Sequence, residues 1–95
     1  MPTDMPTVNV NAGNDGPPSK PRSTGISVLG SNFPPGTVVN ISAAGRRGTA
    51  RVEADGQFDW DFSVRPPLGC GSTVLAVVHG SDGIKVEGEG EVFCP

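Results

Sequence analysis

Residues 56–64 read GQFDWDFSV, and this stretch decides the fold. Phe58, Trp60 and Phe62 alternate here with polar side chains, among them Asp59 and Asp61. Successive side chains of a strand point to opposite faces, so the alternation gives one aromatic face and one polar face. It predicts a half-buried β-strand. Because buried aromatic rings dominate core energetics, we expect the rest of the chain to pack against this strand.

Shorter alternating runs on both sides of this stretch predict further strands. They span residues 26–29, 37–43, 49–53, 74–78 and 84–92, and residues 45–48 are expected to form a loop between two of them. Glycine and proline clusters between the runs predict turns, and no run shows helical spacing, so the chain is expected to be all-β. The predicted core residues are Ile26, Val28, Phe33, Val39, Ile41, Phe58, Trp60, Phe62, Val74, Val78 and Val86.

A three-residue turn over residues 81–83 predicts the register of the last hairpin, because glycine suits its left-handed position. Counting outward from this turn pairs Val78 with Val86 and places Cys70 opposite Cys94. The two cysteines therefore favour a disulfide, which would stabilise the fold by about 3–3.5 kcal/mol. A pair of buried free thiols is the main alternative.

Metal and catalytic chemistry are not expected from this sequence. Two thiolates and the distant His79 make a poor ligand set for a metal ion. The aspartates at residues 55, 59 and 61 do not have the spacing of a calcium-binding loop. No serine, cysteine or acidic residue near His79 in the sequence has the spacing of a catalytic partner, so we expect no enzyme activity and no cofactor.

The first 24 residues are predicted to form an extended arm, followed by a compact domain over residues 25–95. Residues 7–11 suit a short edge strand with Val8 and Val10 on one side. Residues 12–24 contain three prolines and two glycines, which argue against a central strand. We expect either a flexible linker or a segment docked on another protein, and deletion of residues 1–20 is expected to leave the domain folded.

The composition of the 95-residue chain disfavours two classes of partner. The net charge is −3, and a nucleic-acid-binding protein needs clustered Lys and Arg side chains. The first ten residues lack the features of a signal peptide, and no apolar run reaches the length of a membrane span. We therefore expect neither nucleic acid nor a membrane as a partner.

Residues 25–95 resemble bacterial and phage immunoglobulin-like domains. The segments GISVLGSNFPPGTVVNIS, GTARVEADGQFDWDFSV and LGCGSTVLAVVHGSDG match recurring patterns of these domains, such as GxGFxPGTxVxI, ADGxFxxxF and GSDG. The resemblance implies an antiparallel β-sandwich of about seven strands. Such domains serve as adhesive or stalk modules on bacterial surfaces, or decorate the capsids and tails of phages. The chain departs from the antibody pattern because it contains no tyrosine and its cysteines lie together near the C-terminus.

The resemblance leads us to expect a structural protein of the virion surface, made in the host cytoplasm. It would bind a major capsid or tail protein in many symmetric copies. The predicted contact residues are Val8, Val10, Pro17, Pro18, Arg46, Arg47, Leu75 and Val77. The arginines also suit a solvated loop, and isolated exposed apolar residues are ordinary. The alternative is an extracellular or cell-surface module for adhesion or carbohydrate binding, which the burial expected for Trp60 disfavours.

Overall fold

The computed structural model describes residues 5–17, 19–81 and 83–93, which form seven β-strands and no helix. The expectation of an all-β protein is confirmed. No helix that could span a membrane occurs among these residues. The strands are β1 (Thr7–Asp15), β2 (Ser23–Ser31), β3 (Val38–Ala43), β4 (Arg46–Arg51), β5 (Phe58–Val64), β6 (Thr73–Gly80) and β7 (Lys85–Phe93).

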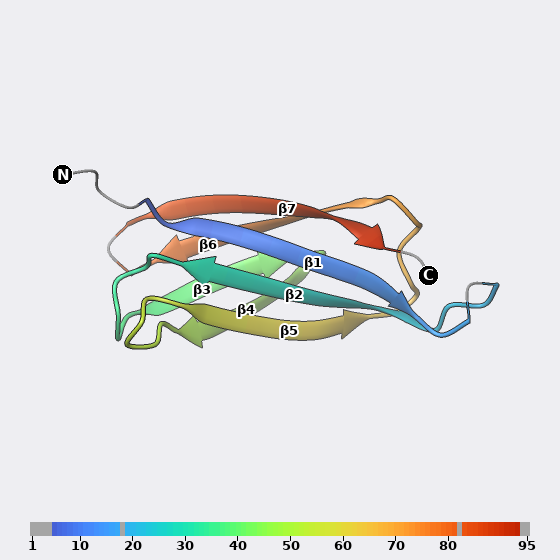
Figure 1. Ribbon diagram of the computed structural model, residues 1–95, viewed down its shortest axis with the longest axis horizontal. Helices are drawn as coiled ribbons and strands as arrows, with labels where there is room; N and C mark the ends of the chain where they lie inside the picture. Colours follow the sequence, from blue (N-terminus) through green and yellow to red (C-terminus); the bar gives the residue numbers. More distant parts are fainter. Residues whose placement is uncertain (1–4, 18, 82, 94–95) are drawn as a thin grey trace.

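The strands form one mixed sheet in the order β4-β3-β6-β7-β1-β2-β5. It contains two antiparallel groups, β4-β3-β6-β7 and β1-β2-β5. A short parallel pairing joins them, in which Ala12 and Gly13 of β1 lie beside Val92 and Phe93 of β7 (Figure 1). Because of this pairing, the sheet is not antiparallel throughout.

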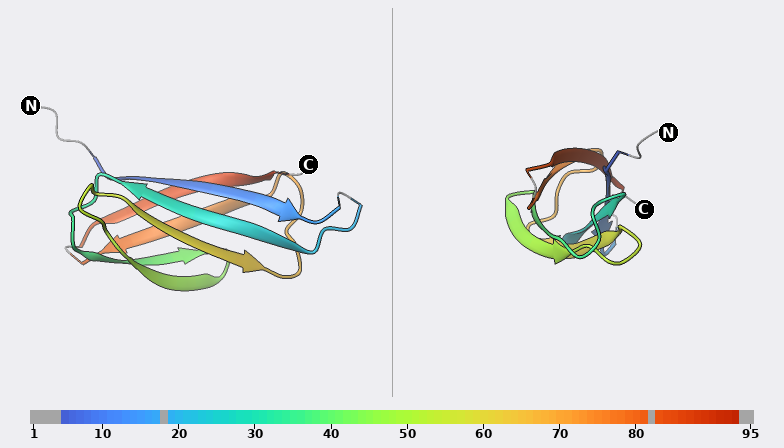
Figure 2. Two further views of the ribbon diagram at one scale, coloured as in Figure 1. Left: turned by 60° about the horizontal axis from the view of Figure 1, so that its bottom comes forward. Right: turned by 90° about the vertical axis from the view of Figure 1, so that its left-hand side faces the viewer.

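The sheet curls until its two ends meet, and the end-on view of Figure 2 shows a nearly closed ring of strands. The closing contact is between β4 and β5. The indole ring of Trp60 lies against Gly48 so closely that a Cβ at Gly48 would overlap the ring. The aromatic strand β5 is the last strand in the order, and its Trp60 side chain closes the gap between β5 and β4.

The interior holds most of the predicted core. Eight of its eleven members are buried, and the other three are half-buried. The buried members of the predicted list are Ile26, Val28, Phe33, Val39, Ile41, Phe58, Val74 and Val78, and Val52 joins them. Trp60, Phe62 and Val86 are half-buried and pack against this core. Trp60 and Phe62 stack with ring centroids 4.5 Å apart, and an end strand leaves part of each ring open to solvent.

The first strand corrects the prediction of an extended arm. β1 runs for nine residues and is paired on both sides, with β2 along its length and with β7 near its end. Val8, Val10 and Ala12 are buried, so the alternation that began at residue 7 continues past residue 11. The expectation that residues 1–20 can be deleted therefore no longer holds.

Short polar side chains are compatible with this strand because they hydrogen-bond to neighbouring loops. The Asn14 side-chain amide donates to the Leu68 carbonyl at 3.2 Å, and the Thr24 hydroxyl donates to Asn14 Oδ1 at 2.6 Å. The backbone N–H of Leu68 donates in turn to the Thr24 hydroxyl at 2.8 Å. Buried polar groups need such partners, and here they fix the end of the β1–β2 hairpin to the loop before β6.

The hairpin between β3 and β4 corrects a second prediction. Residues 46–48 belong to β4, which ends at Arg51, and only Ala44 and Gly45 form the turn. Both turn residues have positive φ, 49° and 75°. Two consecutive positive-φ residues match the right-handed twist of the strands in a tight hairpin, which explains why the loop is shorter than expected.

The register of the β6–β7 hairpin is confirmed. Val78 pairs with Val86, and the Gly80 N–H donates to the Ile84 carbonyl at 2.7 Å. The same register continues outward, where the Val92 N–H donates to the Ser72 carbonyl at 2.8 Å. Cys94 lies outside the described residues, so the pairing of Cys70 with Cys94 stays a prediction.

Candidate protein-binding surface

The β4-β3-β6-β7 group presents an outer surface that we call the charged face. It consists of the side chains that alternate with the buried ones on the four strands. They are Val38, Asn40 and Ser42 on β3, Arg47, Thr49 and Arg51 on β4, Leu75, Val77 and His79 on β6, and Lys85, Glu87, Glu89 and Glu91 on β7. The alternation follows from the pleat of each strand, so the burial of one set fixes the exposure of the other.

Apolar side chains lie in the middle strands of the charged face. Leu75 on β6 is 50% exposed, and Val38 on β3 is 43% exposed. Val77 is half-buried and lies across from Ser42 of β3. Val77 is the apolar neighbour of Leu75 on β6, whereas Val38 lies toward the other end of the face, opposite Arg51. An exposed leucine beside a second apolar side chain is a common component of a protein contact surface.

Opposite charges lie at the two edges of the charged face. Arg47 and Arg51 are exposed on β4, and Glu87, Glu89 and Glu91 are exposed on β7. Lys85 contacts Glu87 at 3.6 Å, but both side chains are more than half exposed, so the pair adds little stability. The basic and acidic edges are separated by β3 and β6, which is about 14 Å across the sheet.

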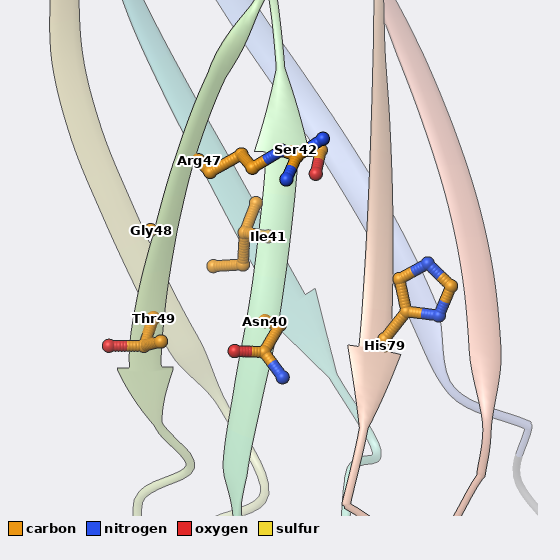
Figure 3. A pocket seen from close by; sticks show the side chains of 7 residues that line it. All are labelled: Asn40, Ile41, Ser42, Arg47, Gly48, Thr49 and His79. Atoms are coloured by element: carbon orange, nitrogen blue, oxygen red, sulfur yellow. The ribbon is translucent and has the colours of Figure 1, made fainter.

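A shallow depression of about 520 Å³ lies over β4, β3 and β6 (Figure 3). Arg47 extends over β3 toward Ser42, and Asn40 and Thr49 lie further along the strands. The imidazole of His79 points away from Ser42, toward β7. The depression therefore offers hydrogen-bonding groups and one guanidinium to a partner, while its histidine and serine do not face one another.

Four of the predicted contact residues lie on or beside the charged face. Arg47, Leu75 and Val77 belong to it, and Arg46 is exposed at the start of β4. They come from two separate hairpins, which the register brings into one sheet through β3 and β6. The acidic edge was not predicted from the sequence, although the glutamates that alternate over residues 87–91 are a visible signal of it.

The remaining predicted contacts lie elsewhere. Val8 and Val10 are only 7% and 6% exposed, so their prediction as contact residues is wrong. They face the core because β1 is a central strand of the sheet. Pro17 is exposed in the loop after β1, and Pro18 lies outside the described residues.

A second shallow depression, of about 540 Å³, lies on the outer side of β1 and β2. Asn11, Asp15 and Ser63 line part of it, and the ring of Phe93 stands beside it with 72% of its surface exposed. Phe93 was not singled out in the sequence, because a lone aromatic at the end of a strand has no distinguishing pattern there.

Among residues 5–17, 19–81 and 83–93, no three His, Cys, Asp or Glu side chains lie close enough together to hold a metal ion. Asp59 and Asp61 are exposed on the solvent side of β5. Asp55 accepts a hydrogen bond from the Gln57 backbone N–H at 3.1 Å within the preceding turn. The three aspartates thus have separate local environments.

Comparison of the chain with family models, with curated proteins and with solved structures finds no match.

Proposed function

We propose that this protein is a non-enzymatic structural module with an immunoglobulin-like β-sandwich fold, which binds other proteins on the surface of a phage particle. The binding surface in this proposal is the charged face. Its exposed Leu75 and half-buried Val77, flanked by arginines on one edge and glutamates on the other, are the observation that carries the proposal.

The connections between the strands support the immunoglobulin-like fold. In such domains strands A, B and E form one sheet and strands C, F and G the other. Here β1, β2 and β5 take the first three places, and β3, β6 and β7 take the second three. β4 adds an extra strand beside β3, as in domains with an additional strand after C. The sheets would then be the two antiparallel groups of the barrel-like body.

The composition of the charged face supports a contact with protein. Specific interfaces combine apolar anchors near the centre with a polar rim, and arginine is enriched in them. Leu75 suits the anchor, and Arg47 suits the rim because its planar guanidinium binds carboxylates through two hydrogen bonds. In this proposal the face contributes binding energy and takes part in no catalysed reaction.

The assignment to a phage particle is supported by the motifs of residues 25–95 that resemble phage and bacterial immunoglobulin-like domains. A particle displays many symmetric copies of its surface proteins. Multiple attachment compensates for weak single contacts through avidity. A small face with one good anchor is therefore sufficient for stable decoration of such a surface.

The proposal is tested on particles purified by density-gradient centrifugation from a culture that carries the gene. We expect the protein in the particle fraction by quantitative mass spectrometry, and we expect Leu75→Asp to lower its copy number at least several-fold. Leu29→Asp, on the opposite side of the barrel, is the matched control and should leave the copy number unchanged. Absence of the wild-type protein from particles would contradict the assignment.

A second candidate function is carbohydrate binding by a cell-surface module. Phe93 favours it, because an exposed ring beside the polar Asn11 and Asp15 offers a sugar both a stacking surface and hydrogen bonds. A glycan array distinguishes this function from the first. Binding that is lost in Phe93→Ala and kept in Leu75→Asp would support it, and no binding to any glycan would remove it.

A further inference from the structure

We infer that the partner on the charged face is a second copy of this chain, packed face to face about a twofold axis that runs parallel to the strands. This inference rests on the proposed function, because it names the partner of the same face. It comes from the layout of charge across the four strands, which is more complementary to itself under this rotation than under a rotation about an axis across the strands.

The register places the side chains of the charged face in rows that cross the sheet. One row runs from Arg47 on β4 through Ser42 and Val77 to Glu87 on β7. The row therefore begins with a positive charge and ends with a negative one. In the neighbouring row, toward the start of β6, Leu75 lies opposite Glu89 of β7.

A twofold axis parallel to the strands, between β3 and β6, lays β4 of one copy over β7 of the other. The same row of residues then meets itself in reverse order. Arg47 faces Glu87 of the second copy, and Glu87 faces Arg47 of the second copy. Val77 of one copy, which neighbours Leu75 on β6, lies over Ser42 of the second copy. Each pair therefore occurs twice, as the symmetry of an isologous dimer requires.

A twofold axis across the strands gives the opposite result. It lays β4 over β4 and β7 over β7, so that Arg47 and Arg51 meet the arginines of the second copy. With the axis at the Arg47 row, Glu87 likewise meets Glu87 of the second copy, and only Lys85 meets an opposite charge, that of Glu89. Like charges in contact cost several kcal/mol at an interface. Charge alone thus selects the axis parallel to the strands.

The size of the face sets the expected strength of the dimer. Four strands about 4.8 Å apart and about six residues long give a face of roughly 15–19 Å by about 20 Å. Two such faces in contact bury roughly 600–760 Å² in total, which is below the usual size of a specific interface and typical of a weak, transient contact. We therefore expect a dissociation constant in the high micromolar range in free solution, and fuller pairing where copies are concentrated on a particle.

The test uses charge reversal and mixing, read by sedimentation equilibrium of the purified chain at about 5 to about 500 µM. The wild type should approach twice its mass of 9.7 kDa. Arg47→Glu alone and Glu87→Arg alone should each weaken the dimer at least tenfold, because each places like charges in both symmetric contacts. Mixed in equal amounts, the two variants should pair with each other, since both contacts then join opposite charges.

Matched controls are Lys20→Glu and Asp61→Arg, which change the charge by the same amounts at exposed positions away from the charged face. Both should dimerise as the wild type does. A wild type that stays monomeric at the highest concentration overturns the inference, as do single variants that dimerise normally or a mixture that fails to pair.

The two proposals fail separately. A monomeric wild type whose attachment to particles is still lost in Leu75→Asp means that the charged face binds a different protein, and the proposed function stands. A wild type that dimerises as described but is absent from purified particles keeps the pairing and removes the function.

Discussion

The two outer faces of the barrel differ in the side chains that they present. The charged face carries arginines, glutamates and Leu75, whose long side chains reach into solvent. The outer face of β1-β2-β5, which we call the small-residue face, carries Gly13, Gly25, Ser27 and Ser63, with larger exposed side chains at Leu29, Asp59 and Asp61. Long anchored side chains supply most of the binding energy at interfaces. The comparison suggests that one strand group provides the contact surface and the other mainly provides the scaffold.

The scaffold role of β1-β2-β5 depends on how closely β1 approaches β7. A Cβ at Gly88 would overlap the carbonyl oxygen of Val8, and one at Gly90 would overlap that of Val10. Only glycine allows the two backbones to lie this close. The N-terminal strand is thereby packed directly against a strand of the charged face.

The largest effect is expected from deletion of residues 1–15, which removes β1 from between β2 and β7. Three buried side chains leave the core, and two strands lose their hydrogen-bonding partner. This is comparable to the entire stability of a small domain, about 5–10 kcal/mol, so the truncated chain should not fold. The measurement is thermal unfolding followed by circular dichroism. A cooperative transition like that of the full chain would show that β1 is dispensable.

The next largest effect concerns the predicted disulfide. A disulfide between Cys70 and Cys94 should contribute about 3–3.5 kcal/mol by restricting the unfolded chain. Reduction should lower the unfolding free energy by that amount without changing the fold. Mass spectrometry after alkylation provides the check, since two alkylated thiols in the absence of reductant would remove the prediction.

Gly88→Ala should cost about 3 kcal/mol, because the new methyl group meets the Val8 backbone and no flexible side chain can move aside. Glu89→Ala, one residue further along β7 and facing solvent, is the control and should change stability by less than about 0.5 kcal/mol.

Gly48→Ala provides a second comparison. Its methyl group meets the half-buried ring of Trp60, a side chain, and not backbone as at Gly88, so we expect a smaller cost of about 1 kcal/mol. Chemical denaturation measures all three, and equal values for Gly88→Ala and Glu89→Ala would disprove the close packing.

Leu75→Asp tests the difference between the faces themselves. It should weaken self-association by about 1–2 kcal/mol, because it removes the apolar anchor and adds a charge next to Glu89. Leu29→Asp makes the same change on the small-residue face, where Leu29 is 37% exposed. Sedimentation should show wild-type association for Leu29→Asp. Equal losses in the two variants would mean that the faces do not differ in function.

The smallest effect is the response to salt. Raising the ionic strength from about 0.05 M to about 0.5 M should weaken self-association about threefold to tenfold, because exposed charge pairs are screened. Arg47→Glu and Glu87→Arg mixed together should show the same salt response as the wild type. An association that strengthens with salt would indicate an apolar contact in place of the charged one.

Local patterns in the sequence were sufficient to predict most strands and the last hairpin. Val74, Ala76 and Val78 alternate without interruption, and the glycine of the 81–83 turn fixes their register. The buried positions of β2 and β3 were predicted for the same reason. Alternation is a local property, so it can be read before any tertiary contact is known.

Long-range placement was not predictable in this way. β1 was interpreted as part of an arm because residues 12–24 contain three prolines and two glycines, whereas the suitability of Asn14 for a strand depends on its partners at Thr24 and Leu68. Trp60 was expected in the core because nothing local shows that β5 lies at the end of the strand order. The charged face combines β4 and β7, whose spatial relation is set by β3 and β6 between them.

The most direct test of the account follows the methyl groups of Leu75 and Leu29 by nuclear magnetic resonance as the protein concentration rises. The account predicts concentration-dependent shifts for Leu75 and its neighbour Val77, with Leu29 unchanged. Shifts at Leu29 without shifts at Leu75, or no shifts at either position, would contradict the claim that the charged face joins two copies of this chain.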